Sequence, residues 1–535
     1  MPVPGIEIRE RPARAGFAPT RADVALFVGL VHRRPGPLPG AVSEWIAQTD
    51  FVRPGPLFRA AEKREALLDI PVPIDSFETF DALFAWDERP LVAGSPEQVP
   101  CRLGLAVRSF FEEGGVKAYV VRTGDPLPVL APQDADPEVA RREFRNLLAW
   151  RKATAPADAD ERAALLPGFI GTAGPGDMRD PANWSGAALV HFLEDVALLL
   201  LPDLPDLIAG PAQVQRTEFV PDTIEEQFVD CAPDAPAIVL LPRPASERVL
   251  APRLAKGDFG TWRKAIGVAL DILAGTGGAS HRRDVMLLAS LPLLDAASLE
   301  GSQNEAERTL ALVHQSGAIS SARLQLAWPW LATPAASTLG EGVEGGEGVL
   351  AGAIARTTLT DGAHSPATGS LRSTIRSSLP ALSKRMLQTT HEPAQADWLG
   401  ATLSLFGRKA GEWRLLSDAT TSGSAHWQAG SVSRLMASLV RNARQLGELF
   451  FFEASSPEIW GRIHRQFESL LRSMWHDGVL GGRSEAEAFS VVCDRRSMTQ
   501  ADIDNGRLVA DIEVLPAQLV ERIKVSLVLW AGDKA

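Results

Sequence analysis

The 535-residue chain has only three cysteines, Cys101, Cys231 and Cys493, and no CxxC pair. Disulfide frameworks and cysteine-based zinc sites need more cysteines at closer spacing. Neither kind of cross-link is therefore predicted, and the low count favours a reducing compartment.

Excess positive charge and long hydrophobic runs are also missing. The formal net charge is -12, whereas general nucleic-acid binders are usually basic. The most apolar stretch, residues 188–210, is interrupted by His191, Glu194 and Asp195, and a membrane span needs about 20 apolar residues. Residues 1–16 lack the apolar core of a secretory signal. We expect no nucleic-acid partner and no direct membrane insertion.

The short motifs of common enzyme classes are absent: there is no GxxxxGK[ST], no HExxH and no GxSxG. The segment GEGVEG at 340–345 matches GxGxxG by its letters. However, no helical pattern follows it at once, and Glu341 and Glu344 would repel a pyrophosphate. We interpret residues 336–348 as a flexible acidic loop.

His191 and Asp195 have the spacing of a shared metal site on a helix, but their apolar surroundings favour packing in the core or at an interface. We expect no catalytic residues, no metal and no cofactor, and the chain is predicted not to be an enzyme.

Strand-like and helix-like segments alternate along most of the chain. Residues 75–84 predict a short helix with Asp75 or Ser76 as N-cap, and residues 101–124 predict a helix that ends at Gly114 and Gly115 and is followed by a strand. Residues 262–275 predict an amphipathic helix, and buried strands are predicted at 22–31, 195–206, 282–294 and 321–331. This alternation is typical of an α/β fold with a mostly parallel sheet.

Both ends of the sequence show the period-two alternation of a half-buried strand. The alternating apolar residues are Ile6 and Ile8 near the start, Leu508, Ile512 and Val514 in a first C-terminal strand, and Ile523, Val525 and Leu527 in a second. Such strands expose unpaired main-chain groups at sheet edges, which can pair with another chain.

One of the long C-terminal helices, at residues 458–475, has clear end signals: Ser456 as N-cap, Pro457 in the first turn and Gly478 as the stop. Arg462, Arg465 and Arg472 lie beside its apolar stripe. They predict either a solvated basic face or a surface that docks onto an acidic partner.

Several segments together resemble one family, the tail sheath proteins of contractile phage tails and related contractile injection systems. They are PGIEIRE and ALFVGLVHRRPGPLP near the start, LAVRSFFEEGGVKAYVVR, then WPWL followed by GVLAGAIARTTLTDGAHSPATG, and the block from WGRIHRQFESLLRSMWHDGVLGG to the last strand. The last 80 residues are the most specific part. The element before the "AG" reads EGGEG, and LFGRKAG is a diverged form of another family element.

The resemblance implies a sheath core domain built from both termini, residues 1–35 and 370–535, with strand-exchanging arms. Residues 36–369 would be an outward-facing α/β insertion of subtilisin-like topology. Within it, 75–124 and 185–369 are sheath-like, and 41–70 and 125–180 are diverged insertions.

The resemblance also implies a structural function. Six subunits would form a ring around an inner tube, rings would stack helically, and contraction would drive the tube through a target envelope. Partners would be further copies of the chain, the inner tube protein, baseplate and cap proteins, and other sheath paralogues. The arms would contain Ile6, Ile8 and the C-terminal strands, and Arg462, Arg465 and Arg472 would contact the tube.

Such a particle would assemble in the bacterial cytoplasm, as part of a phage tail or injection system, and some are released from the cell. Two alternatives remain open at this point. One is a non-contractile or terminal paralogue near a baseplate or cap, and the other is a subtilisin-like hydrolase.

Overall fold

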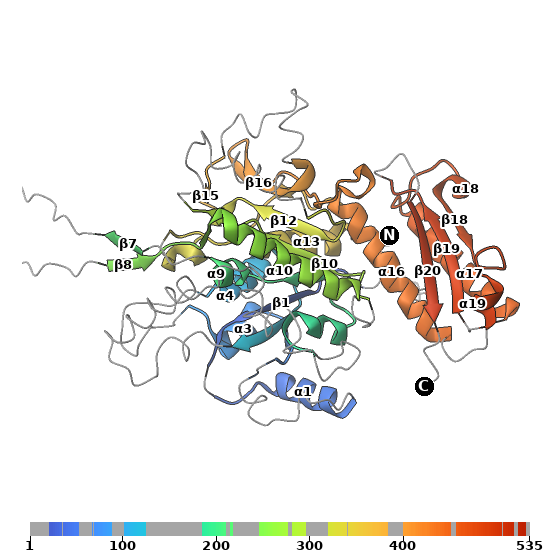
Figure 1. Cartoon of the computed structure of the whole chain (residues 1–535), viewed down its shortest axis with the longest axis horizontal. Helices are drawn as coiled ribbons and strands as arrows, with labels where there is room; N and C mark the ends of the chain where they lie inside the picture. Colours follow the sequence, from blue (N-terminus) through green and yellow to red (C-terminus); the bar gives the residue numbers. More distant parts are fainter. Residues whose placement is uncertain are drawn as a thin grey trace, which may run out of the picture.

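The computed structural model of the chain describes residues 21–34, 36–52, 67, 69–87, 101–124, 184–209, 214–217, 246–275, 281–295, 319–339, 341–382, 400–450, 456–504, 507–517 and 523–530. These residues form two hydrophobic cores, a large one around a nine-stranded sheet and a smaller one near the C-terminus. Figure 1 shows the second as a separate body at the end of a long helix.

The nine-stranded sheet has the strand order β14-β17-β16-β12-β10-β6-β1-β5-β3. The strands from β16 to β5 are all parallel, whereas β3, β17 and β14 are antiparallel to their neighbours. The bounds are β1 Ala25–Leu30, β3 Val72–Ile74, β5 Ala118–Gly124, β6 Leu198–Leu200, β10 Met286–Ser290, β12 Leu324–Trp328, β14 Gly369–Ser370, β16 Ser404–Lys409 and β17 Glu412–Leu415. The predicted α/β fold with a mostly parallel sheet is confirmed.

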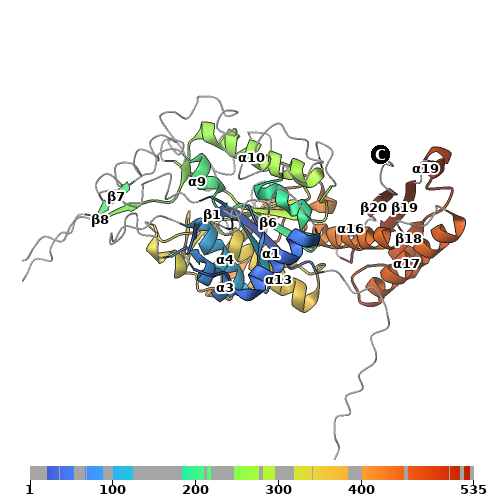
Figure 2. The ribbon, with the colours of Figure 1, turned by 90° about the horizontal axis from the view of Figure 1, so that it is seen from below.

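Helices cover both faces of this sheet (Figure 2). On one side lie α9 Leu204–Ile208 and α10 Lys256–Ala274, and on the other lie α3 Phe77–Leu83, α4 Arg102–Glu113 and α13 Glu347–Asp361. Helix α13 packs closely on α4, because a Cβ added at Gly352 would lie 2.6 Å from the carbonyl oxygen of Phe110. Close packing of this kind places the start of α13 at a fixed position over the sheet.

Short elements complete this body. They are α1 Gly40–Val52, the 3-10 helices η3 Gly186–Phe192, η4 Ala335–Thr338 and η5 Ala425–Trp427, and the strand pairs β2 His32–Arg33 with β4 Phe84–Ala85, β7 Val214–Thr217 with β8 Ser246–Val249, β9 Arg253–Leu254 with β11 Leu293–Leu294, and β13 Trp330–Ala332 with β15 Ser377–Leu379. We call the described residues from 21 to 427 the larger unit.

The C-terminal unit comprises the described residues from 430 to 530. A three-stranded antiparallel sheet, in the order β18-β19-β20, packs with two long helices, α16 and α17. Its elements are α16 Gly430–Phe450, α17 Pro457–His476, α18 Glu485–Ala488, β18 Phe489–Val492, α19 Gln500–Asp504, β19 Arg507–Val514 and β20 Ile523–Trp530.

The described residues are grouped differently from the predicted core domain of 1–35 and 370–535. Strand β1 lies in the middle of the nine-stranded sheet, between β5 and β6, and residues up to Leu415 share that core. The second core begins only at Val432. Strand β1 thus finds both of its partner strands in the segment that was expected to be an insertion, and the predicted division of the whole chain into a core domain and an insertion stays a prediction. The likeness to subtilisin stays a prediction, and residues 125–180 lie outside the described residues.

Several local predictions are confirmed. Ser76 caps α3 by accepting a hydrogen bond from the Thr79 amide at 3.3 Å. Gly114 ends α4 with φ 113°, in the left-handed region that glycine adopts without strain. In addition, Trp328 and Trp330 are almost completely buried in hydrophobic clusters.

Candidate functional site

The C-terminal sheet holds most of the residues that were predicted to mediate assembly. Strands β19 and β20 pair over eight positions, from Arg507 opposite Trp530 to Val514 opposite Ile523. Along β19, every second residue is buried, namely Leu508, Ala510, Ile512 and Val514, and the residues that alternate with them are partly exposed, so the predicted alternation is confirmed.

The two strands find their partners within this chain. Ile523 is buried in the same core, and the main chain of Val525 and Leu527 lies opposite Ile512 and Ala510. Strand β19 is central, whereas β18 and β20 are the edges of the sheet among the described strands. Any pairing with another copy would therefore use the outer main-chain edges, since Leu508, Ile512, Val514 and Ile523 already belong to this chain's own core. Ile6 and Ile8 lie outside the described residues.

Helix α17 begins and ends as its sequence predicts. Ser456 accepts a hydrogen bond from the Ile459 amide at 3.4 Å, Pro457 is the first helical residue, and Gly478 follows the helix with φ 75°. Its apolar face packs on the sheet through Ile459, Trp460, Ile463, Phe467 and Leu471.

The opposite face of α17 carries the three predicted arginines, all of them exposed. They are not equivalent, because Arg472 makes a two-pronged ion pair with Glu485 at 2.8 and 3.0 Å. Arg472 thus ties α17 to α18 within the unit, while Arg462 and Arg465 lie on the outer surface.

A buried ionic cluster that the sequence did not predict lies at the amino ends of the parallel strands. Asp284, which precedes β10, is 0% exposed and lies within 2.8 to 3.4 Å of the guanidinium groups of Arg282, Arg441 and Arg444. Burial by itself would raise the pKa of Asp284, but the arginines outweigh it and hold that pKa far below its usual value. Asp284 is therefore charged and fully compensated.

A second buried carboxylate, Asp418, lies beside the amino end of β12. It accepts two hydrogen bonds from Arg434, at 2.9 and 2.6 Å, one from Gln325 at 2.7 Å and one from the Ala367 amide at 2.9 Å. Burial opposes its ionisation, yet Arg434 and these donors lower the pKa of Asp418.

The predicted flexible loop at 336–348 is wrong for the described residues. Glu344 and Glu347 are only 2% and 4% exposed. The main chain of Glu344 pairs with Leu331, and its carboxyl group accepts hydrogen bonds from Ser109 at 3.0 Å and from Thr333. A helix, α13, begins directly at Glu347, so the helical pattern that appeared to be missing is present.

These two glutamates lie near the carboxyl ends of the strands, where Ser290 at the end of β10 donates to Glu347. Burial raises the pKa of Glu344 to about 8, although Thr333 and Ser109 oppose this. Burial likewise raises the pKa of Glu347 to about 7, with its own amide and Arg102 opposing. Of the two glutamates in GEGVEG, Glu344 is thus buried and favours its neutral form. Burial opposes the ionisation of Glu341 as well, but its ion pair with Arg253 at 2.6 Å lowers its pKa.

The hydrolase alternative finds no support in this cluster. Ser290 is 3% exposed and its hydroxyl group is bonded to a carboxyl group that favours its neutral form. A serine nucleophile needs an exposed hydroxyl and an effective base.

His191 and Asp195 do not come together. Burial and Arg282 lower the pKa of His191 to about 4, and its ring packs 5.4 Å from Trp184. Asp195 instead pairs with Lys117 at 2.7 Å. Within the described residues there is no group of three potential metal-binding side chains of the His, Cys, Asp and Glu types, and no helix there has the length and apolar character to cross a membrane.

Comparison with known proteins finds similarity in structure only. No protein-family model and no curated protein matches the sequence. Among solved structures, a chain of the anti-feeding prophage helical sheath in the contracted state aligns with a TM-score of 0.51 and 16% identity, covering 98% of this chain and 99% of that one.

Two further chains align over similar lengths. One, from the sheath complex of the PVC extracellular contractile injection system in its contracted state, has a TM-score of 0.50 and 14% identity, with 97% and 96% of the two chains covered. The other, from the anti-feeding prophage baseplate, has a TM-score of 0.51 and 15% identity, with 98% and 99% covered. Over 97–98% of its residues, the chain therefore has the fold of these sheath and baseplate chains of contractile injection systems.

Proposed function

We propose that this protein is a structural subunit of a contractile sheath. The observation that carries the proposal is that the fold agrees with sheath chains over nearly the full length of both molecules, including the C-terminal unit. Arg462 and Arg465, and the edges of the three-stranded sheet, are the surfaces by which such a subunit would assemble.

In this function, six copies form a ring around an inner tube and the rings stack into a helix. The outer edges of β18 and β20 each offer a row of main-chain donors and acceptors, which a strand from a neighbouring copy can complete. The N-terminal segment with Ile6 and Ile8 is the proposed donor of one such strand. Contacts between unlike surfaces of this kind extend into helical polymers.

Contraction of this polymer would drive the tube through a target envelope, without enzymatic chemistry. The particle would assemble in the bacterial cytoplasm together with baseplate and cap proteins, as part of a phage tail or an injection system, and it could then be released. No cofactor is needed for this function.

Negative-stain electron microscopy of the purified chain tests the proposal. We expect tubular polymers or stacked rings from the full chain, and folded monomers after deletion of residues 1–10. Long sheaths formed by the deletion variant would reject the proposal that the N-terminal segment donates a strand to a neighbouring copy. Monodisperse single particles from the full chain under all conditions would reject the sheath function.

Truncation after Pro516 is a poorer test of assembly than the deletion of residues 1–10. It removes β20, which pairs with β19 over eight residues and contributes Ile523 to the core. We expect this truncation to destabilise the C-terminal unit as well as to block assembly.

The proposed tube-facing surface is the outer face of α17 around Arg462 and Arg465. Exposed charges steer and orient protein association. Reversal of both charges, Arg462→Glu with Arg465→Glu, should abolish co-sedimentation with inner tubes. Arg496→Glu, a reversal at an exposed arginine paired with Asp494, is the control and should leave co-sedimentation unchanged. Unchanged co-sedimentation of the double variant would reject this surface.

A baseplate-proximal or cap-proximal paralogue is the second candidate, because a chain of the anti-feeding prophage baseplate aligns equally well. Imaging separates the two: a terminal subunit forms single rings or binds the end of a sheath, whereas a main sheath subunit forms long tubes that shorten on contraction.

A further inference from the structure

Helix α16 has two buried faces of opposite character. One face is apolar and belongs to the core of the C-terminal unit, through Val432, Leu435, Met436, Leu439, Ala443 and Leu446. The other carries Arg434, Arg441 and Arg444. The first two of these are 3% exposed, although arginine is almost never fully buried unless it is paired.

The arginine face lies across the amino ends of four neighbouring strands of the larger unit. Near the start of the helix, Arg434 binds Asp418 and approaches Gln325 of β12 at 3.4 Å. Farther along, the Arg441 guanidinium donates to the main-chain carbonyl groups of Arg21, Val196 and Asp284, the segments that lead into β1, β6 and β10. One side chain thus joins three strands.

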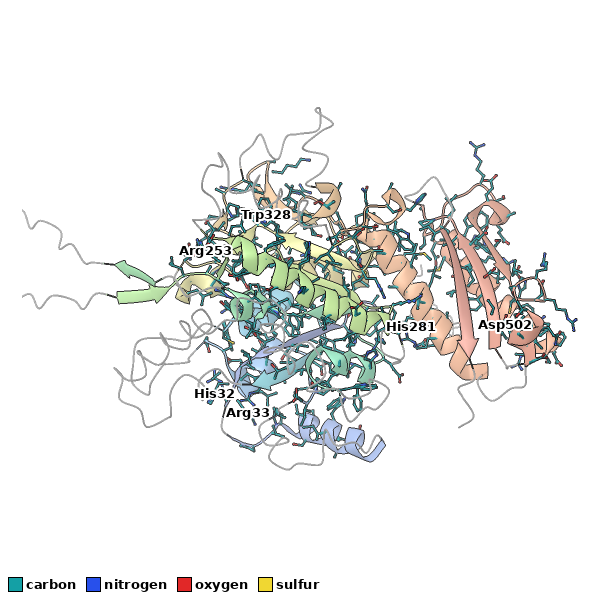
Figure 3. The ribbon with its side chains drawn as sticks, in the orientation of Figure 1. His32, Arg33, Arg253, His281, Trp328 and Asp502 are labelled. Carbon is teal, nitrogen blue, oxygen red and sulfur yellow. The ribbon has the colours of Figure 1, made fainter. Side chains whose placement is uncertain are left out.

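Arg444 completes the contact one turn later. It donates to the carboxyl group of Asp284 at 2.8 Å and to the carbonyl group of His281 at 3.1 Å. Figure 3 places His281 where α16 leaves the larger unit. Helix α16 therefore belongs to the hydrophobic core of the C-terminal unit and also forms buried ion pairs with the larger unit.

The ionic character of this contact restricts how the two units can be oriented relative to each other. Guanidinium groups that donate to several fixed acceptors require one orientation of the helix relative to those acceptors. Separation of a buried ion pair is also costly, because it leaves an uncompensated charge inside the protein. Both features favour a single relative orientation of the two units.

We propose that α16 is a coupling helix, whose arginines 434, 441 and 444 lock the C-terminal unit to the sheet of the larger unit so that the two turn as one body. Its use during contraction rests on the proposed function, whereas the lock itself is a property of the single chain.

The experiment measures the distance between the two units in the full chain. Spin labels are attached at Val268→Cys on α10, where the native side chain is 46% exposed, and at Ser469→Cys on the exposed face of α17. Cys101 and Cys493 are buried, and Cys231 is replaced by serine. Labelled chain is diluted into excess unlabelled chain, so that double electron–electron resonance reports distances within one molecule.

The unmodified helix should give one narrow distance distribution. Arg434→Met with Arg441→Met should lose the single narrow peak, while hydrogen exchange shows that the core of each unit stays protected. Arg472→Met removes an arginine that is paired within the C-terminal unit, and it should keep the narrow peak.

A broad distribution in the unmodified protein would overturn the proposal, and so would a narrow, unshifted peak in the folded double variant. If the double variant does not fold, Arg441→Lys is decisive, because a lysine cannot reach all the acceptors of Arg441. That variant should broaden the peak, and an unchanged peak would overturn the lock. Absence of tubes in electron microscopy would reject the sheath function without affecting this result.

Discussion

Asp284 and Asp418 lie at the amino ends of the central strands, whereas Glu344 and Glu347 lie near the carboxyl ends, and all four side chains are buried. Burial opposes ionisation in every case. The pKa values nevertheless move apart. Those of the aspartates are lowered because arginines outweigh burial, whereas those of the glutamates are raised by burial, which the hydrogen-bond donors of Glu344 and the amide and Arg102 beside Glu347 do not outweigh. Similar burial thus leaves charged carboxylates at one end of the sheet and favours neutral carboxyl groups at the other, because the groups that contact them differ.

The largest expected change in the free energy of unfolding is at Asp284, at the amino ends of the strands. Asp284→Asn keeps the shape but leaves three arginines without their buried counter-charge, and the breaking of such a pair costs about 3–5 kcal/mol. Urea denaturation at pH 7 should show a lower free energy of unfolding by about that amount. A loss within experimental error would mean that the arginines do not depend on Asp284.

Glu344 and Glu347 should make the free energy of unfolding depend on pH at neutral and alkaline values. Their folded pKa values, about 8 and about 7, lie above the ordinary value of 4.5, so the folded state holds more protons than the unfolded state. Their contribution to stability is complete below about pH 4.5 and is lost as the pH rises through 7 and 8.

We expect the free energy of unfolding to fall by about 1–3 kcal/mol between pH 7 and pH 9. Glu344→Gln with Glu347→Gln should flatten this slope and make the variant more stable than the native protein at pH 9. Parallel pH profiles of the two proteins would contradict this assignment.

At acid pH we expect a smaller change, in which the free energy of unfolding falls as the pH is lowered. The folded pKa of Asp284 is depressed, so its contribution to stability is present above the ordinary pKa near 4 and is lost as the pH falls below it. Between pH 5 and pH 3 the native protein should lose about 1 kcal/mol more than Asp284→Asn. Equal losses in urea titrations at the two pH values would show that Asp284 is not the group that titrates.

The smallest effect is expected at an exposed pair. Asp494 lies 2.7 Å from Arg496, and both side chains are well exposed to solvent. Water and salt screen such a pair. Asp494→Asn should therefore leave the midpoint of urea denaturation unchanged, and a clear shift would show that distance rather than burial controls these pairs.

Local features of the fold could be predicted because they depend on neighbouring residues. The caps at Ser76 and Ser456, the stop at Gly114 and the alternation along β19 each use groups within about four positions of one another. The α/β class followed from the order of such segments. The domain boundary could not be predicted in this way, because it depends on which strands become neighbours of β1.

The candidate surfaces were predictable only in part. The exposure of Arg462 and Arg465 follows from the helical period of α17, but the pairing of Arg472 with Glu485 depends on how α18 folds back. The segment GEGVEG was misinterpreted because glycine and glutamate are common in loops. Glu344 is buried only because Ser109, 235 positions away, and Thr333 provide hydrogen-bond donors.

The sequence by itself determined the types of the elements, their ends and the overall resemblance to sheath proteins, since these depend on side-chain periodicity and local backbone geometry. Only the tertiary structure decided which carboxyl groups are charged and how the two units are joined. Arg441 is 157 positions from Asp284, and its charge and bonds act on that residue only after the chain has folded.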